Sequence, residues 1–68
     1  MQHRWVEFIQ DFLITIHENI RELQERRNFA APDELDHIEA KLLAYNEILF
    51  ALQASAAEFK IPKDQVGL

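Results

Sequence analysis

Two series of apolar residues, separated by a single proline, constrain this chain more than any other feature of its sequence. In the first half, large apolar residues recur in steps of three and four, at Val6, Ile9, Leu13, Ile16, Ile20 and Leu23. In the second half the same steps recur, at Leu35, Ile38, Leu42, Tyr45, Leu49, Leu52, Ala56 and Phe59. Such steps align side chains along one stripe of an α-helix. The sequence therefore predicts two amphipathic helices, each with an apolar seam.

Pro32 marks the break between the two helices, because proline lacks a backbone N–H and its ring clashes with the preceding turn of a helix. The charges agree, since cations suit the end of a helix and anions suit its start. The cations Arg26 and Arg27 lie just before the break, and the anions Asp33, Glu34 and Asp36 lie just after it. Pro62 prevents the second helix from continuing.

These signals predict a helical hairpin over residues 1–60. The first helix is expected at about 2–28, the turn at 29–32 and the second helix at about 33–60. Residues 61–68 follow Pro62 and are expected to form a flexible C-terminal tail.

A short turn makes consecutive helices antiparallel neighbours. The numbers of facing seam residues should then add up to a constant. Leu23 with Ile38 gives 61 and Ile20 with Leu42 gives 62, and every other seam pair gives one of these two values. The agreement predicts an all-α fold, an antiparallel coiled-coil hairpin. In this register Tyr45 lies in the seam, where its hydroxyl is expected to find Asn19 or Asn46, or to stay at the surface.

The composition excludes several classes of protein. Of the 68 residues 49% are hydrophobic, one is glycine and none is cysteine. A disordered chain is poorer in large apolar residues, whereas a disulfide scaffold and the common structural zinc sites need cysteine. A β-sandwich needs more turns than one glycine supplies. A single small domain remains, and a chain this short buries little surface alone.

The charge balance and the apolar segments bear on location. The net charge of −5 opposes attraction to nucleic acid or to anionic membranes. We expect no secretory signal, because Glu7, Gln10 and Asp11 interrupt the first apolar stretch. The apolar stretch at 42–57 contains Asn46, Glu47 and Gln53, so we expect it to be too polar to span a bilayer. We expect a cytoplasmic protein.

The seams leave many apolar residues unused. Of 25 large apolar side chains, 13 lie in the seams and 12 do not. The 12 are Met1, Trp5, Phe8, Phe12, Ile14, Phe29, Leu43, Ile48, Phe50, Ile61, Val66 and Leu68. Several gather on one flank of the hairpin, which we call the apolar face: Trp5, Phe8, Phe12, Ala44, Ile48 and Ala51. The opposite flank is polar.

An apolar face of this kind indicates an interface. A second copy related by a two-fold axis would cover it and produce a homodimeric four-helix bundle. Another protein with a complementary groove would serve equally. Leu43 and Phe50 lie elsewhere on the second helix; they either enlarge the same contact, the interpretation we favour, or form a second partner surface.

No arrangement of residues predicts catalysis, a cofactor or a metal. Glu34 and His37 have the spacing of di-iron bundles, but the core positions are Leu35 and Ile38, so the pair fits a solvated helix start better. Ser55 is the single serine and has no histidine near it in the helical register. We therefore expect a protein that is not an enzyme.

The basic patch of note consists of Arg21, Arg26 and Arg27. The acidic residues across the turn should largely neutralise it, so contact with nucleic acid is the weaker interpretation. A symmetric dimer would double the patch, which keeps RNA binding as an alternative.

In length, acidity and hairpin layout the chain resembles the Rop-like plasmid RNA-binding regulators. It is also similar to the short hairpin co-chaperones of type III secretion needles. The first resemblance implies an RNA-binding bundle, and the second implies an apolar face reserved for a partner subunit. Both are resemblances of architecture, without shared residue motifs.

Overall fold

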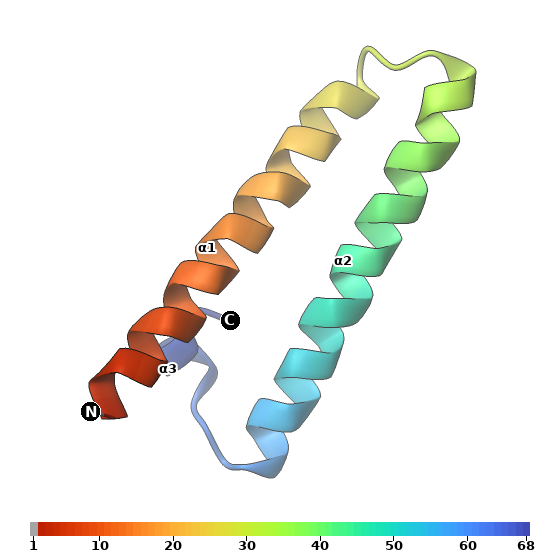
Figure 1. Ribbon diagram of the computed structural model, residues 1–68. Coiled ribbons are helices and arrows are strands. Elements are labelled where there is room, and N and C mark those ends of the chain that lie inside the picture. The colour runs from red at the N-terminus through yellow and green to blue at the C-terminus, as the bar shows by residue number, and fades with distance from the viewer. Residues whose placement is uncertain (1) are drawn as a thin grey trace.

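The computed structural model describes the backbone of residues 2–68 and the side chains of residues 4–65, 67 and 68. It contains the helices α1 (Gln2–Arg27), α2 (Pro32–Glu58) and α3 (Lys63–Val66). The two long helices run antiparallel and pack along their length (Figure 1), which confirms the all-helical hairpin. Met1 and the side chain of Val66, both counted among the unused apolar residues, lie outside the described part.

The bounds of the long helices differ from the expected ones by no more than two residues. Proline is well placed at the start of α2, because Ala31 is extended, with φ −69° and ψ 158°, and Pro32 takes the first helical position. The Leu35 N–H donates to the Ala31 carbonyl at 2.9 Å and closes the first helical turn. The first turn of α2 also carries Asp33 and Glu34, which suit the positive end of the helix.

The core comes from the two seams. The buried apolar residues among those described are Leu13, Ile16, Leu23, Ile38, Leu42 and Ala56. Near the turn, Leu23, Ile38 and Leu42 pack together, and Ile20 and Tyr45 pack against them. These are the partners that the predicted register requires. Leu13 is the most completely buried large side chain, with 1% of its surface exposed.

Phe59 corrects the predicted seam. Its side chain is 76% exposed, although the heptad placed it in the core. Phe59 caps α2 just past its last residue, Glu58, and lines an open hollow with Ile9 and Ile61 instead of being enclosed between the helices. The chain then reverses at Lys60, which adopts the left-handed conformation with φ 59°.

Residues 59–61 form a Schellman turn. The Ile61 N–H donates to the Ala56 carbonyl at 2.8 Å, and the Lys60 N–H donates to the Ala57 carbonyl at 3.1 Å. This pair of bonds satisfies carbonyl groups that the end of a helix leaves without partners. It also turns the chain back toward α1.

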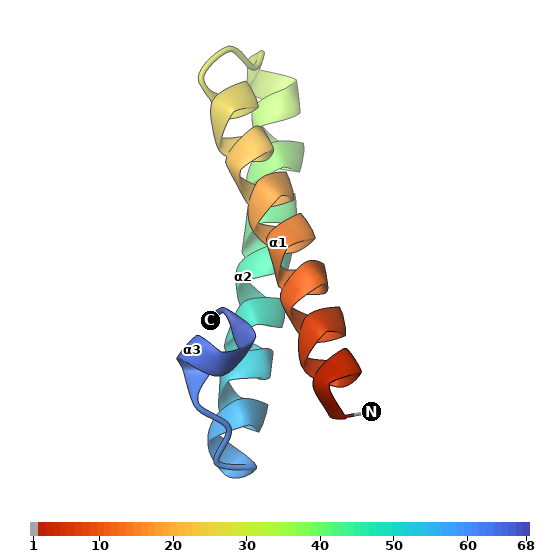
Figure 2. The same cartoon turned by 90° about the vertical axis from the view of Figure 1, so that its left-hand side faces the viewer.

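The C-terminal segment corrects a second expectation. Within the segment that was expected to be a flexible tail, residues 63–66 form the short helix α3, which contacts α1. The Gln10 side-chain amide donates to the Gln65 carbonyl at 2.8 Å. Figure 2 shows α3 beside the lower half of the hairpin, with both termini toward that end. We call it the open end, opposite the turn at residues 28–31.

The molecule is elongated. Its extents are 46 × 20 × 15 Å and its radius of gyration is 14.5 Å, whereas a compact domain of this length has about 11 Å. None of the helices in the described residues combines the length and the apolar character needed to cross a membrane.

Candidate protein–protein interface

The apolar face is exposed on both long helices. Trp5 is 71% exposed, Phe8 60%, Phe12 46% and Ile48 47%. Ala44 and Ala51 are exposed as well. Large apolar side chains that stay in water on one flank are the usual mark of a binding surface.

Trp5 and Phe8 lie in direct contact on α1. Their ring centroids are 6.2 Å apart and their planes are 88° to one another, an edge-to-face arrangement. This geometry brings the positive edge of one ring to the negative face of the other. Phe12 follows Phe8 by one helical turn, so the three aromatic residues form a continuous row on α1.

The register brings α2 residues to the same flank. Phe12 precedes the seam residue Leu13 and Ile48 precedes the seam residue Leu49, so in the seam register the numbers of facing residues on this flank add up to about 60. By the same offset, Phe12 lies at the level of Ile48. The apolar face is thus built jointly by α1 and α2.

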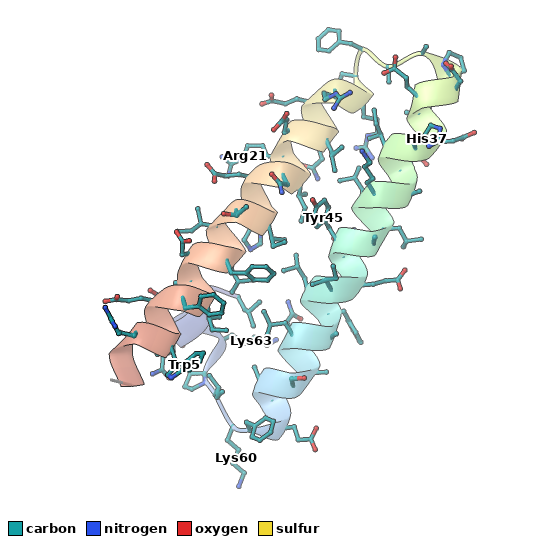
Figure 3. All side chains as sticks on the ribbon, viewed as in Figure 1. Trp5, Arg21, His37, Tyr45, Lys60 and Lys63 are labelled. Carbon is teal, nitrogen blue, oxygen red and sulfur yellow. The ribbon has the colours of Figure 1, made fainter. Side chains whose placement is uncertain are left out.

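Nearer the turn the same flank is polar. A hollow of about 160 Å³ is lined by Asn19, Glu22, Leu23, Arg26, Lys41 and Tyr45. Within it the Asn19 amide donates to the Tyr45 hydroxyl at 3.2 Å, which confirms one of the two amide partners expected for that hydroxyl. Tyr45 points into the space between the helices (Figure 3).

Helix α3 leaves the apolar face open. It contacts α1 through Gln10, and two residues along an α-helix correspond to about 200° of rotation. Gln10 therefore faces away from both Phe8 and Phe12. Trp5 is an intermediate case, because it also lines a hollow with Ile61 and Gln65 at the open end. The C-terminal segment thus covers part of the flank that was expected to be polar and solvated.

Leu43 and Phe50 lie apart from the apolar face. They are 61% and 74% exposed. Leu43 lines a hollow with Arg27, Glu39, Ala40 and Asn46, on the flank opposite to the apolar face. Both interpretations of Leu43 and Phe50, as an enlargement of the same contact or as a second partner surface, stay predictions.

The three arginines lie in different surroundings. Arg26 lines the hollow that contains Lys41, whereas Arg27 lines the hollow that contains Glu39. Arg21 lies on the side of α1 that is turned away from α2 (Figure 3). A duplex or hairpin RNA needs cations gathered on one surface, and contact of these arginines with RNA stays the weaker prediction.

The candidate chemical groups are solvated and scattered. Glu34, His37 and His17 are exposed, and no three His, Cys, Asp or Glu residues of the described part gather into a possible metal site. Ser55 lines an apolar hollow with Ile9, Leu52, Ala56, Phe59 and Ile61. That hollow holds no base in hydrogen-bond reach of the hydroxyl among its lining residues.

The sequence interpretation missed the residues that close the open end. These are Gln10, Lys60, Ile61 and Gln65, together with the exposed Phe59. A signal was present, because Ile61, Val66 and Leu68 give the last eight residues apolar side chains that a solvated tail does not need.

Comparison with protein-family models, with curated proteins and with solved structures finds no match for this chain.

Proposed function

We propose that this chain is a small interaction or regulatory protein, without enzymatic activity, that works as a homodimeric four-helix bundle. The observation that carries the proposal is the apolar face, on which Trp5, Phe8, Phe12 and Ile48 each expose close to half of their surface or more. In a bundle of two hairpins these side chains would become the core between the copies.

The accessible surface of the hairpin is large enough to supply an interface with a second copy of the chain. The accessible surface is 5718 Å², roughly 1,300 Å² more than the about 4,450 Å² expected of a compact monomer of 8.0 kDa. A standard interface buries about 800 Å² on each partner. The excess surface is larger than the area that one partner contributes to a standard interface.

The aromatic row supplies much of the area that such an interface needs. With side chains of about 200 Å² each, Trp5, Phe8 and Phe12 leave roughly 350 Å² of aromatic surface accessible per copy. Aromatic anchors at the centre of an interface carry most of its affinity. The proposal includes a cytoplasmic location, which the lack of cysteine supports.

A sedimentation equilibrium experiment tests the proposal. The wild type should be a dimer at micromolar concentration, and Phe8→Glu/Phe12→Glu should be a monomer because it places two carboxylates in the interface. Leu43→Glu/Phe50→Glu is the matched control, with two like substitutions on the opposite flank, and should remain dimeric. A stably folded wild-type monomer would contradict the proposal. It would instead direct attention to a different protein as the partner that covers the same face.

A further inference from the structure

The flank that carries the apolar face changes character along its length. The half next to the open end is apolar, with Trp5, Phe8 and Phe12 on α1 and Ile48 on α2. The half next to the turn carries Glu22 and Arg26 on α1, and Glu34 and Lys41 on α2. Any second copy that docks here must match both halves, which restricts the symmetry of the dimer.

A two-fold axis perpendicular to the helices fits the flank poorly. It would lay α1 of one copy antiparallel on α1 of the other, with residue 15 at the centre of a full overlap. Phe8 would then face the level of Glu22 in the second copy, and an ionised carboxylate would lose water against an aromatic ring. The two copies could instead slide along their helices until the two apolar halves face each other. This staggered arrangement would leave the charged halves, and about half of the available area, outside the contact.

A two-fold axis parallel to the helices matches both halves at once. It places α1 of one copy beside α2 of the other at unchanged height, with both turns at the same end. Because the seam register gives facing positions on this flank numbers that add up to about 60, Phe12 meets the level of Ile48 of the second copy. Neighbouring helices run antiparallel here as they do about the perpendicular axis, so the match of side chains and not of helix dipoles separates the two arrangements.

The charged halves are complementary in that arrangement. Arg26 lies at the level of Glu34 of the second copy, and Glu22 lies within one helical turn of the level of Lys41 of the second copy. Like charges on one flank would have opposed this docking, whereas each cation here has a carboxylate opposite it. Charge complementarity of this kind sets the register and orientation of an interface.

We infer that the two copies dock with their two-fold axis parallel to the helices, so that α1 of each copy packs on α2 of the other and both turns lie at the same end. The partner for this surface is a second copy of the same chain, and the inference rests on the proposed function. Helix α3 bonds to α1 through Gln10, on the opposite flank, and reaches the apolar face only beside Trp5 at the open end, so Phe8, Phe12 and Ile48 stay accessible to the second copy.

Disulfide trapping with single-cysteine variants tests the inference, because the chain has no cysteine of its own. Thr15 and Ala44 are exposed residues at facing levels of α1 and α2 on this flank. A mixture of Thr15→Cys chains with Ala44→Cys chains should form a mixed disulfide dimer on mild oxidation. Neither chain should crosslink to itself, because equivalent residues then lie diagonally across the bundle, beyond the reach of a disulfide.

Each other outcome overturns the inference in a recognisable way. Self-crosslinking of Thr15→Cys alone would indicate the fully overlapped perpendicular arrangement. Self-crosslinking of Ala51→Cys alone would indicate the staggered one. Sedimentation of the reduced variants separates the two levels of the argument: a dimer with the wrong crosslinks contradicts the topology, whereas a monomer contradicts the proposed function itself.

Discussion

The Asn19 side-chain amide donates a hydrogen bond of 3.2 Å to the Tyr45 hydroxyl and joins α1 to α2 in the middle of the hairpin. The residues are 26 positions apart in the chain, and the bond is partly buried. It gives the polar tip of a seam residue a partner without breaking the apolar stripe.

Tyr45→Phe should lower the free energy of unfolding by about 0.5–1.5 kcal/mol, because a hydrogen atom replaces the hydroxyl group of Tyr45 and the amide of Asn19 loses its acceptor. Urea denaturation followed by circular dichroism measures the change. Asn46→Ala is the control, since Asn46 was the other residue expected to bind this hydroxyl; the substitution should change stability by less than about 0.5 kcal/mol. Equal losses in the two variants would argue against the bond.

Leu13→Ala should be strongly destabilising, because Leu13 has 1% of its surface exposed and no room exists for the helices to close the cavity without shifting the seam. The expected loss is about 2–5 kcal/mol, a large part of the stability of a domain this small. Ile14→Ala removes a similar volume from a side chain that is 58% exposed. Thermal melts of the two variants should differ clearly, and similar midpoints would show that the seam is not the core.

Lys60→Gly should stabilise the protein by up to about 1 kcal/mol. Lys60 has φ 59°, a conformation that costs an L-residue about 1–2 kcal/mol and glycine much less; the larger backbone entropy of glycine in the unfolded chain reduces the gain. Lys60→Ala removes the same charge and keeps the strain, so it should leave the midpoint of the thermal melt near that of the wild type. A glycine variant no more stable than the alanine variant would contradict the left-handed turn.

Gln10→Ala should loosen α3 without unfolding the hairpin. The Gln10–Gln65 bond is exposed and links the C-terminal segment to α1, and such segments open locally at low cost. Limited trypsin digestion after Lys60 and Lys63 should therefore be several-fold faster in the variant, with an unchanged melting midpoint. Gln24→Ala, on the same flank near the turn, should digest at the wild-type rate.

Much of the hairpin could be predicted because its information is local and periodic. The steps between Val6 and Leu23 and between Leu35 and Ala56 define two helical stripes. Pro32 can begin a helix but cannot lie in the interior of one. The exposure of Trp5, Phe8, Phe12 and Ile48 followed from the same pattern, because two helices have two seams and no third layer on that flank.

The tertiary structure decided what happens at the open end. A heptad count placed Phe59 in the core, but the helix ends one residue earlier, and the left-handed Lys60 sends the chain back along α1. Other details likewise depend on which side of a helix faces its neighbour. They include the choice of Asn19 over Asn46 as the partner of Tyr45, the different hollows that Arg26 and Arg27 line, and the docking of Gln65 on Gln10. Periodicity determines the stripe that a residue occupies. Where a helix stops and how the chain reverses depend on a few backbone angles and long-range hydrogen bonds, for which a sequence of this length offers no repeated pattern.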